Sequence, residues 1–126
     1  MSDKRILFGK KGEDIAREYL KQLGYRILLS NYKTKLGEID IIAQDQDTLV
    51  FVEVKTRSSD SRGTPAEAVT PFKQHHMARV ALVYLKEKKM FDRKARFDVV
   101  TVDFSQTPAA VGLLKNAFEL DARFTF

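Results

Sequence analysis

The chain of 126 residues contains 22 Lys and Arg against 17 Asp and Glu, and its net charge of +5 favours polyanionic partners such as nucleic acid. The absence of cysteine excludes disulfides, thiol nucleophiles and cysteine-bound zinc, and no apolar window reaches the roughly eighteen residues of a membrane span. A hydrophobic share of 44%, with nine Phe and four Tyr, argues against global disorder and predicts one domain over residues 1–126, which the lack of cysteine and of a membrane span leads us to expect to be soluble and cytoplasmic.

The first predicted elements are a helix and a short strand. Apolar residues at helical spacing, followed by a terminating glycine, predict a helix over residues 12–24; they are Ile15, Ala16, Tyr19, Leu20, Leu23 and Gly24. Residues 25–29 are short and apolar, which is typical of a strand, and Asn31 closes them. Residues 32–37 are interpreted as a polar, basic connection.

Two further strands are predicted over residues 38–44 and 48–57. In the first of them, branched residues at 39 and 41 alternate with acids at 38 and 40, and the second is rich in β-forming residues. Because residues 45–47 favour a turn, the two strands should form a hairpin. A two-residue turn and a four-residue loop of the same register both remain open, since Gln46 and Asp47 are not typical of a tight turn.

The register of this hairpin decides where its charged side chains lie. When the numbers of opposed residues sum to 93, one face is wholly apolar and consists of Ile39, Ile41, Ala43, Val50, Val52 and Val54. Asp40 then falls opposite Glu53, and Glu38 opposite Lys55. Even sums would destroy this segregation, so we expect the odd register.

The second half of the chain predicts a helix and two strands. Thr70 and Pro71 suit an N-cap and first turn, and a stripe of core residues follows at Met77, Val80, Ala81, Tyr84 and Leu85. The helix should end near Met90. Residues 96–102 predict a fourth strand, and the tail over residues 113–126 is assigned a fifth on its apolar character alone.

The opposed acids indicate a site for a divalent cation. Two facing carboxylates cost roughly 0.2–1 kcal/mol unless a cation lies between them. Mg²⁺ or Mn²⁺ would accept oxygen ligands from Asp40, Glu53, the carbonyl of Val54, water and a substrate phosphate. Lys55 projects from the same face as Glu53 and could hold the attacking water or neutralise the phosphate. The alternative is a salt-bridge network in which the lysine balances two acids.

Glu13 is a further candidate ligand. It lies three residues before Ala16 and seven before Leu20, so it shares the inward stripe of its helix and could bind the metal or a water. The alternative is an ordinary first-turn acid favoured by the helix dipole.

The interval of twelve residues between Asp40 and the Glu53-Val54-Lys55 triplet resembles the PD-(D/E)XK nuclease signature, with Ile39 where that signature prefers proline. The chain also resembles the bacterial YraN family nearly throughout, at Gly9-x-x-Gly12-Glu13, Asn31-Tyr32 and residues 37–43, 50–57 and 96–100. That resemblance implies an α/β, restriction-endonuclease-like core of α-β-β-β-α-β order, with a mixed sheet flanked by helices as in archaeal Holliday-junction resolvases. It also implies a nuclease site at Glu13, Asp40, Glu53 and Lys55.

Several basic residues border the predicted site and could contact phosphates without reading bases; they are Lys10, Lys11, Lys33, Lys35, Arg57, Arg62 and Lys73. Simple solvation is the alternative for these side chains. His75 and His76 are adjacent on a helix, so they diverge by about 100° and are interpreted as surface residues rather than ligands of one ion.

Three functions are consistent with this pattern. The first is a Mg²⁺- or Mn²⁺-dependent endonuclease acting on branched or single-stranded DNA, with Asp40, Glu53 and Glu13 as metal ligands. The second is a non-catalytic nucleic-acid-binding module that retains the nuclease fold, and the third is an assembly factor that acts through protein contacts. Resolvase-like cutting of a symmetric junction would also require a homodimer.

Overall fold

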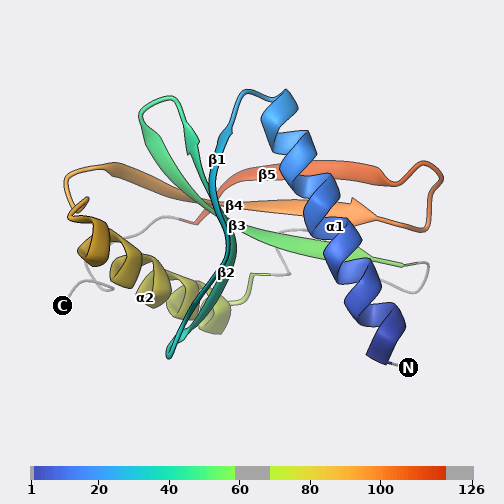
Figure 1. Cartoon of the computed structure of the whole chain (residues 1–126), viewed down its shortest axis with the longest axis horizontal. Helices are drawn as coiled ribbons and strands as arrows, with labels where there is room; N and C mark the ends of the chain where they lie inside the picture. The colour runs from blue at the N-terminus through green and yellow to red at the C-terminus, as the bar shows by residue number, and fades with distance from the viewer. Residues whose placement is uncertain (1, 59–68, 119–126) are drawn as a thin grey trace.

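A computed structural model describes residues 2–58 and 69–118, with side chains from Gly9 onward. The elements follow in the order α1 (Ser2–Gln22), β1 (Arg26–Thr34), β2 (Gly37–Asp45), β3 (Thr48–Arg57), α2 (Pro71–Lys88), β4 (Lys94–Asp103) and β5 (Ala110–Phe118) (Figure 1). The predicted α-β-β-β-α-β order is therefore confirmed, and a fifth strand completes it. Neither helix in this part of the chain has the length and apolarity needed to cross a membrane.

The five strands form one mixed sheet in the order β1-β2-β3-β4-β5. β3 and β4 pair in parallel, whereas the other neighbouring strands are antiparallel. A parallel pair needs a long crossover, and α2 lies in the connection that provides it. β3 is thus the central strand, with the hairpin partner β2 on one side and the crossover partner β4 on the other.

Each helix packs against its own hydrophobic core, and in Figure 1 the strands separate the two helices. The α1 core joins the helix to β2, β3 and β4 and includes Ala16, Leu20, Ile41, Val52 and Val100. The α2 core includes Met77, Ala81, Leu85, Phe51 and Phe97. Because both faces of the sheet are covered, the central strands are apolar along most of their length.

The second helix begins where its sequence predicted. The Oγ1 atom of Thr70 accepts a hydrogen bond from the backbone nitrogen of Lys73 at 3.2 Å, and Pro71 occupies the first turn. At the other end, Lys89 adopts a left-handed conformation and its backbone nitrogen donates to the carbonyls of Leu85 and Lys86.

The predictions placed the starts of α1 and β5 too late in the chain and the end of β1 too early. α1 begins at Ser2 rather than near residue 12, and β5 begins at Ala110 rather than at residue 113. β1 continues to Thr34, so residues 32–34 are strand and not a connection. They extend β1 because Tyr32 pairs with Ile39 and Lys33 with Glu38. The part of the predicted tail beyond residue 118 lies outside the described residues.

The register predicted for the β2–β3 hairpin is confirmed. Ile41 opposes Val52 and Asp45 opposes Thr48, so the connection is a two-residue turn of Gln46 and Asp47. Gln46 adopts a φ of 56°, the left-handed conformation that such turns require and that a glycine or asparagine would adopt more readily.

The prediction that Ile39 shares the face of Ile41 was wrong. Ile39 belongs to the α2 core, together with the partly buried Tyr32 that pairs with it, whereas Ile41 belongs to the α1 core. The change of face occurs at Asp40, next to Asn31 of β1, which has a φ of 55°. A left-handed residue breaks the regular alternation of a strand, and asparagine tolerates that conformation better than most residues.

Candidate active site

Asp40 and Glu53 lie at the point where β2 and β3 separate. The described β2–β3 ladder ends at Ile41 and Val52, so Asp40 and Glu53 follow immediately beyond the last pair, and pairing does not extend to Glu38 and Lys55. The Oδ2 atom of Asp40 accepts a hydrogen bond from the backbone nitrogen of Val54 at 2.8 Å. The Asp40 side chain thus accepts from a backbone N–H of β3 that a carbonyl of β2 would bind in a continued ladder. This hydrogen bond fixes the Asp40 carboxylate against β3.

Burial and two neighbouring acids disfavour the ionised form of Asp40. Burial, the charge of Glu53 and the charge of Glu13 together raise the pKa of Asp40 from 3.8 to about 7, although the hydrogen bond from Val54 opposes them. A side-chain hydrogen bond with Glu53 is a smaller cause of the same rise in the pKa of Asp40. Like charges in a partly desolvated place favour the neutral acid, so this site would gain from a cation.

Glu13 reaches this environment because α1 approaches β3 very closely. Gly12 is buried, and a β-carbon at this position would overlap the side-chain methyl group of Thr56 on β3. Glycine therefore permits a helix-to-strand approach that a larger residue would prevent, and the next residue, Glu13, is half-buried beside the sheet. Its inward position agrees with the sequence stripe, and its charge acts on Asp40.

Lys73 is the cation that the structure places against the acidic pair. Its Nζ atom lies 2.6 Å from Oε2 of Glu53, with 42% of the lysine side chain and 15% of the glutamate side chain exposed. The sequence suggested Lys73 only as a phosphate contact. The pairing with Glu53, twenty residues away, could not be read from spacing because it depends on how α2 crosses the sheet.

Lys55 has a different environment from Lys73. It is exposed near the end of β3, two residues after Glu53, and strand alternation directs both side chains to the same side. Within the part of the chain that the structure describes, Lys55 forms no ion pair. Its ammonium group is therefore free to bind water or a phosphate.

The donor set fits Mg²⁺ or Mn²⁺ in part. Among the described residues, no three His, Asp or Glu side chains gather closely enough to hold an ion, so Glu13 does not complete a ligand triad with Asp40 and Glu53. Mg²⁺ nevertheless binds through one or two carboxylates and keeps several waters. Asp40 and Glu53 supply two such carboxylates, and burial together with the charge of Glu53 raises the pKa of Asp40.

The other predicted basic residues lie at varied positions. Lys10 and Lys11 are exposed on α1, Lys33 is exposed on β1, and Lys35 is exposed in the β1–β2 turn. Arg57 is half-buried. The hydrogen bonds from Ser105 lower the pKa of Asp103, and the charge of Arg57 contributes to the same shift to a smaller extent. Arg62 lies outside the described residues. His75 and His76 are exposed, as the sequence predicted.

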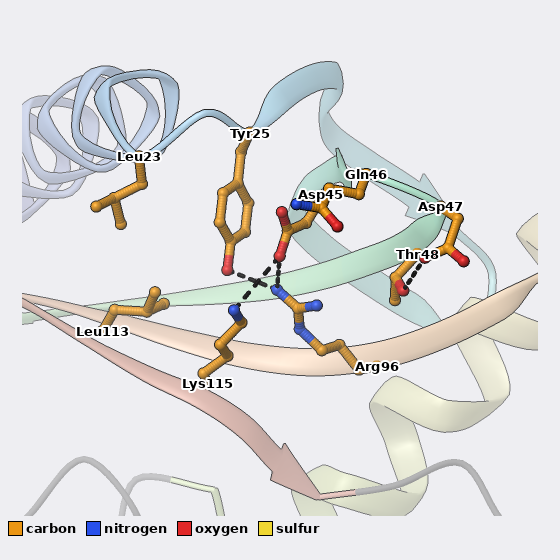
Figure 2. Close-up of a pocket in the computed structure, with 9 residues that line it drawn as sticks. All are labelled: Leu23, Tyr25, Asp45, Gln46, Asp47, Thr48, Arg96, Leu113 and Lys115. Carbon is orange, nitrogen blue, oxygen red and sulfur yellow. Dashed lines mark hydrogen bonds and ion pairs between the residues drawn. The ribbon is translucent and has the colours of Figure 1, made fainter.

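A second polar cluster, which sequence reasoning missed, lies at the opposite end of the hairpin. Asp98 is fully buried and accepts hydrogen bonds from the Tyr25 hydroxyl at 2.9 Å and from Nε of Arg96 at 3.1 Å. Arg96 also binds Asp45 at 2.7 Å, beside Lys115 (Figure 2). Tyr25, Asp45, Arg96 and Lys115 line a cavity of about 510 Å³, and Asp98 lies buried behind them. Because its charges are already paired with one another, we interpret this cluster as structural.

The model of the Uncharacterised protein family UPF0102 matches residues 12–102. The chain belongs to UPF0102, the YraN family. A UPF0102 protein of Syntrophus aciditrophicus is 51% identical over 112 residues, covering 89% of this chain and 88% of the relative. A UPF0102 protein of Alkaliphilus oremlandii is 50% identical over 112 residues, covering 87% and 96%. A third, from Geobacter sulfurreducens, is 47% identical over 115 residues, covering 90% of each.

The UPF0102 match includes all four residues of the candidate site. It begins at Gly12, whose close contact with β3 places Glu13, and it ends at Val102 in β4. Asp40, Glu53 and Lys55 lie on β2 and β3 inside that span. The resemblance inferred from the motifs and the membership shown by the comparison therefore concern the same part of the fold.

Proposed function

We propose that this UPF0102 protein is a metal-dependent hydrolase of nucleic-acid phosphodiesters whose site consists of Glu13, Asp40, Glu53 and Lys55. The observation that carries the proposal is the approach of two half-buried carboxylates at the open end of the β2–β3 hairpin, with the exposed Lys55 two residues beyond Glu53 on the same strand. Such a site binds a hard divalent ion and a phosphate together. The bound ion would supply charge neutralisation and a more acidic water.

The protein residues would each have a defined task. Asp40 is held at Oδ2 by the Val54 nitrogen, and an ion would replace the hydrogen bond between Asp40 and Glu53. Glu53 completes the pair from the neighbouring strand, and Glu13 adds negative charge from α1. Lys55, which is exposed, would orient the attacking water and stabilise charge that develops on the phosphate.

Basic side chains near the site support a polyanionic substrate. Lys10 and Lys11 precede Glu13 on α1 and are exposed, and the whole chain carries a net charge of +5. Phosphate contacts of this kind give affinity that falls steeply with salt and carries no base preference. We propose DNA, branched or single-stranded, as the substrate, and a homodimer where two strands of a symmetric junction are cut.

The decisive experiment combines metal binding with cleavage. Mn²⁺ is titrated by calorimetry into the wild-type protein, Asp40→Asn and Asp47→Asn, and each protein is then incubated with branched and single-stranded DNA. Asp47 is a matched control because it lies on the same hairpin, at its exposed turn end. Asp40→Asn should lose both Mn²⁺ binding and cleavage, whereas Asp47→Asn should retain them. Equal cleavage by all three proteins overturns the assignment.

A non-catalytic nucleic-acid-binding module is the second candidate. Two observations favour it. Among the described residues, no third carboxylate or imidazole joins Asp40 and Glu53 in a set that could hold a metal, and Lys73 neutralises the charge of Glu53. Salt-sensitive DNA binding without turnover in Mg²⁺ or Mn²⁺ would support this candidate. Absence of DNA binding at low salt would contradict both.

A further inference from the structure

Lys73 has a well-defined position at the start of α2. The Thr70 side chain caps its backbone nitrogen at 3.2 Å, and the Gln74 nitrogen donates to the Thr70 carbonyl at 2.8 Å. The Gln74 side chain also donates to the Val69 carbonyl at 2.9 Å. These contacts fix the first turn of the helix, so the Lys73 side chain extends from a rigid base toward β3.

The ammonium group of Lys73 binds one of the two oxygens of the Glu53 carboxylate, which we propose as a metal ligand. Oε2 of Glu53 is taken by Lys73 at 2.6 Å, and Oδ2 of Asp40 is taken by the Val54 nitrogen at 2.8 Å. The Val54 contact belongs to the strand framework and orients Asp40. The Lys73 contact is made by a flexible side chain that is 42% exposed, and it can move away without disturbing the helix.

We propose that Lys73 is an internal counterion that competes with the metal for Glu53 and, once displaced, binds the phosphate of the substrate. This inference rests on the proposed function, because it concerns the same acidic pair. An ammonium and a divalent ion on one carboxylate oxygen would repel each other at close range. Binding of the ion therefore releases Lys73, and a released lysine at the rim of the site is placed to meet a phosphate beside the ion.

The first test is calorimetric titration of Mn²⁺ into the wild-type protein, Lys73→Gln, Lys73→Arg and Lys94→Gln. Removing the competing charge should tighten Mn²⁺ binding by about tenfold in Lys73→Gln, whereas Lys73→Arg should bind like wild type or more weakly. Lys94→Gln is a matched control, since Lys94 also pairs with an aspartate, Asp47, but at the exposed end of the hairpin. Unchanged or weaker Mn²⁺ binding by Lys73→Gln overturns the inference.

The second test measures binding of a fluorescent DNA with and without Ca²⁺, an ion that takes the same oxygen ligands. Lys73→Gln should weaken DNA binding by about threefold or more in Ca²⁺ and change it little without the ion, because Lys73 is then held by Glu53. If Lys73→Gln weakens DNA binding equally with and without Ca²⁺, Lys73 contacts phosphate whether or not the ion is bound. That result would contradict the proposed displacement of Lys73 from Glu53 by the ion.

The outcomes separate this inference from the proposed function. Mn²⁺ binding that Asp40→Asn abolishes but Lys73→Gln leaves unchanged would preserve the metal site and reject the role of Lys73. Binding that appears only in Lys73→Gln would support both. Absence of Mn²⁺ binding in wild type and in Lys73→Gln would overturn both.

Discussion

The side chains of Asp40 and Glu53 approach each other just beyond the last residue pair of β2 and β3, and burial together with the charge of Glu53 raises the pKa of Asp40 to about 7. In the unfolded chain the same group has its ordinary pKa of 3.8. The raised pKa favours folding at low pH, and this contribution is lost as the pH rises through about 7.

Asp40→Asn should therefore stabilise the protein at about pH 8, because the amide cannot ionise and its oxygen can still accept the Val54 hydrogen bond. The gain in the free energy of unfolding should be about 1–4 kcal/mol at that pH and near zero at about pH 3.5. Thermal denaturation at both values measures it. A lower melting temperature for Asp40→Asn at about pH 8 would show that burial and the charge of Glu53 do not disfavour the ionised form of Asp40.

Metal binding should depend on pH for the same reason. An ion binds the carboxylate form of Asp40, so below pH 7 it must displace a proton, and Mn²⁺ affinity should fall by about tenfold per pH unit. Calorimetry in two buffers of different ionisation enthalpy should detect release of about one proton near pH 6 and almost none near pH 9. Affinity that stays constant between these values would argue against Asp40 as a ligand.

Gly12 should be far less tolerant of substitution than Gly9, although both lie in α1. Gly12→Ala forces a methyl group against Thr56, and we expect it to destabilise the protein by about 1–3 kcal/mol and to displace Glu13. A β-carbon on Gly9 meets nothing within 4 Å, so Gly9→Ala should stabilise the helix by up to about 1 kcal/mol. Denaturant unfolding compares the two variants, and equal effects would show that the close approach is unimportant.

Asp98 should be a structural residue whose loss unfolds the protein without involving the candidate active site. Asp98→Asn leaves the half-buried Arg96 without its buried partner, and we expect a loss of about 3 kcal/mol or more. Burial, followed by the hydrogen bond to Asp98, raises the pKa of Tyr25 well above its usual value, so the phenol remains a hydrogen-bond donor to Asp98. Asp47→Asn, whose pair with Lys94 is exposed, should leave the melting temperature unchanged. Mn²⁺ affinity should be unaltered in any folded Asp98→Asn protein.

The register of the β2–β3 hairpin could be predicted because only an odd sum keeps the apolar residues of both strands on one face. The same reasoning failed at Ile39, because it assumed a regular strand and Asn31 interrupts the neighbouring one. The alternation of apolar and polar residues predicts which face a side chain occupies in a regular strand, but it does not indicate where the strand departs from regular geometry.

The features that the sequence did not predict depend on contacts between segments that are distant in the chain. The acidic pair was visible from the sequence because one hairpin brings both acids together. The contacts of Lys73 with Glu53 and of Asp98 with Tyr25 were not visible, because they join residues twenty and seventy-three positions apart and depend on the crossover and on the packing of α1. Sequence patterns determine which face a residue occupies within an element, whereas the pairing of faces across the sheet is a property of the whole fold.

The parallel pairing of β3 with β4 has a consequence for the order in which the chain folds. The two-residue turn between β2 and β3 closes a short loop, so the hairpin can form early and locally. The parallel pair must wait for the whole crossover that contains α2, which is a slower, non-local event. Because Asp40 and Glu53 lie on the hairpin and Lys73 lies on α2, we expect the two acids to come close before the Lys73 ammonium reaches Glu53.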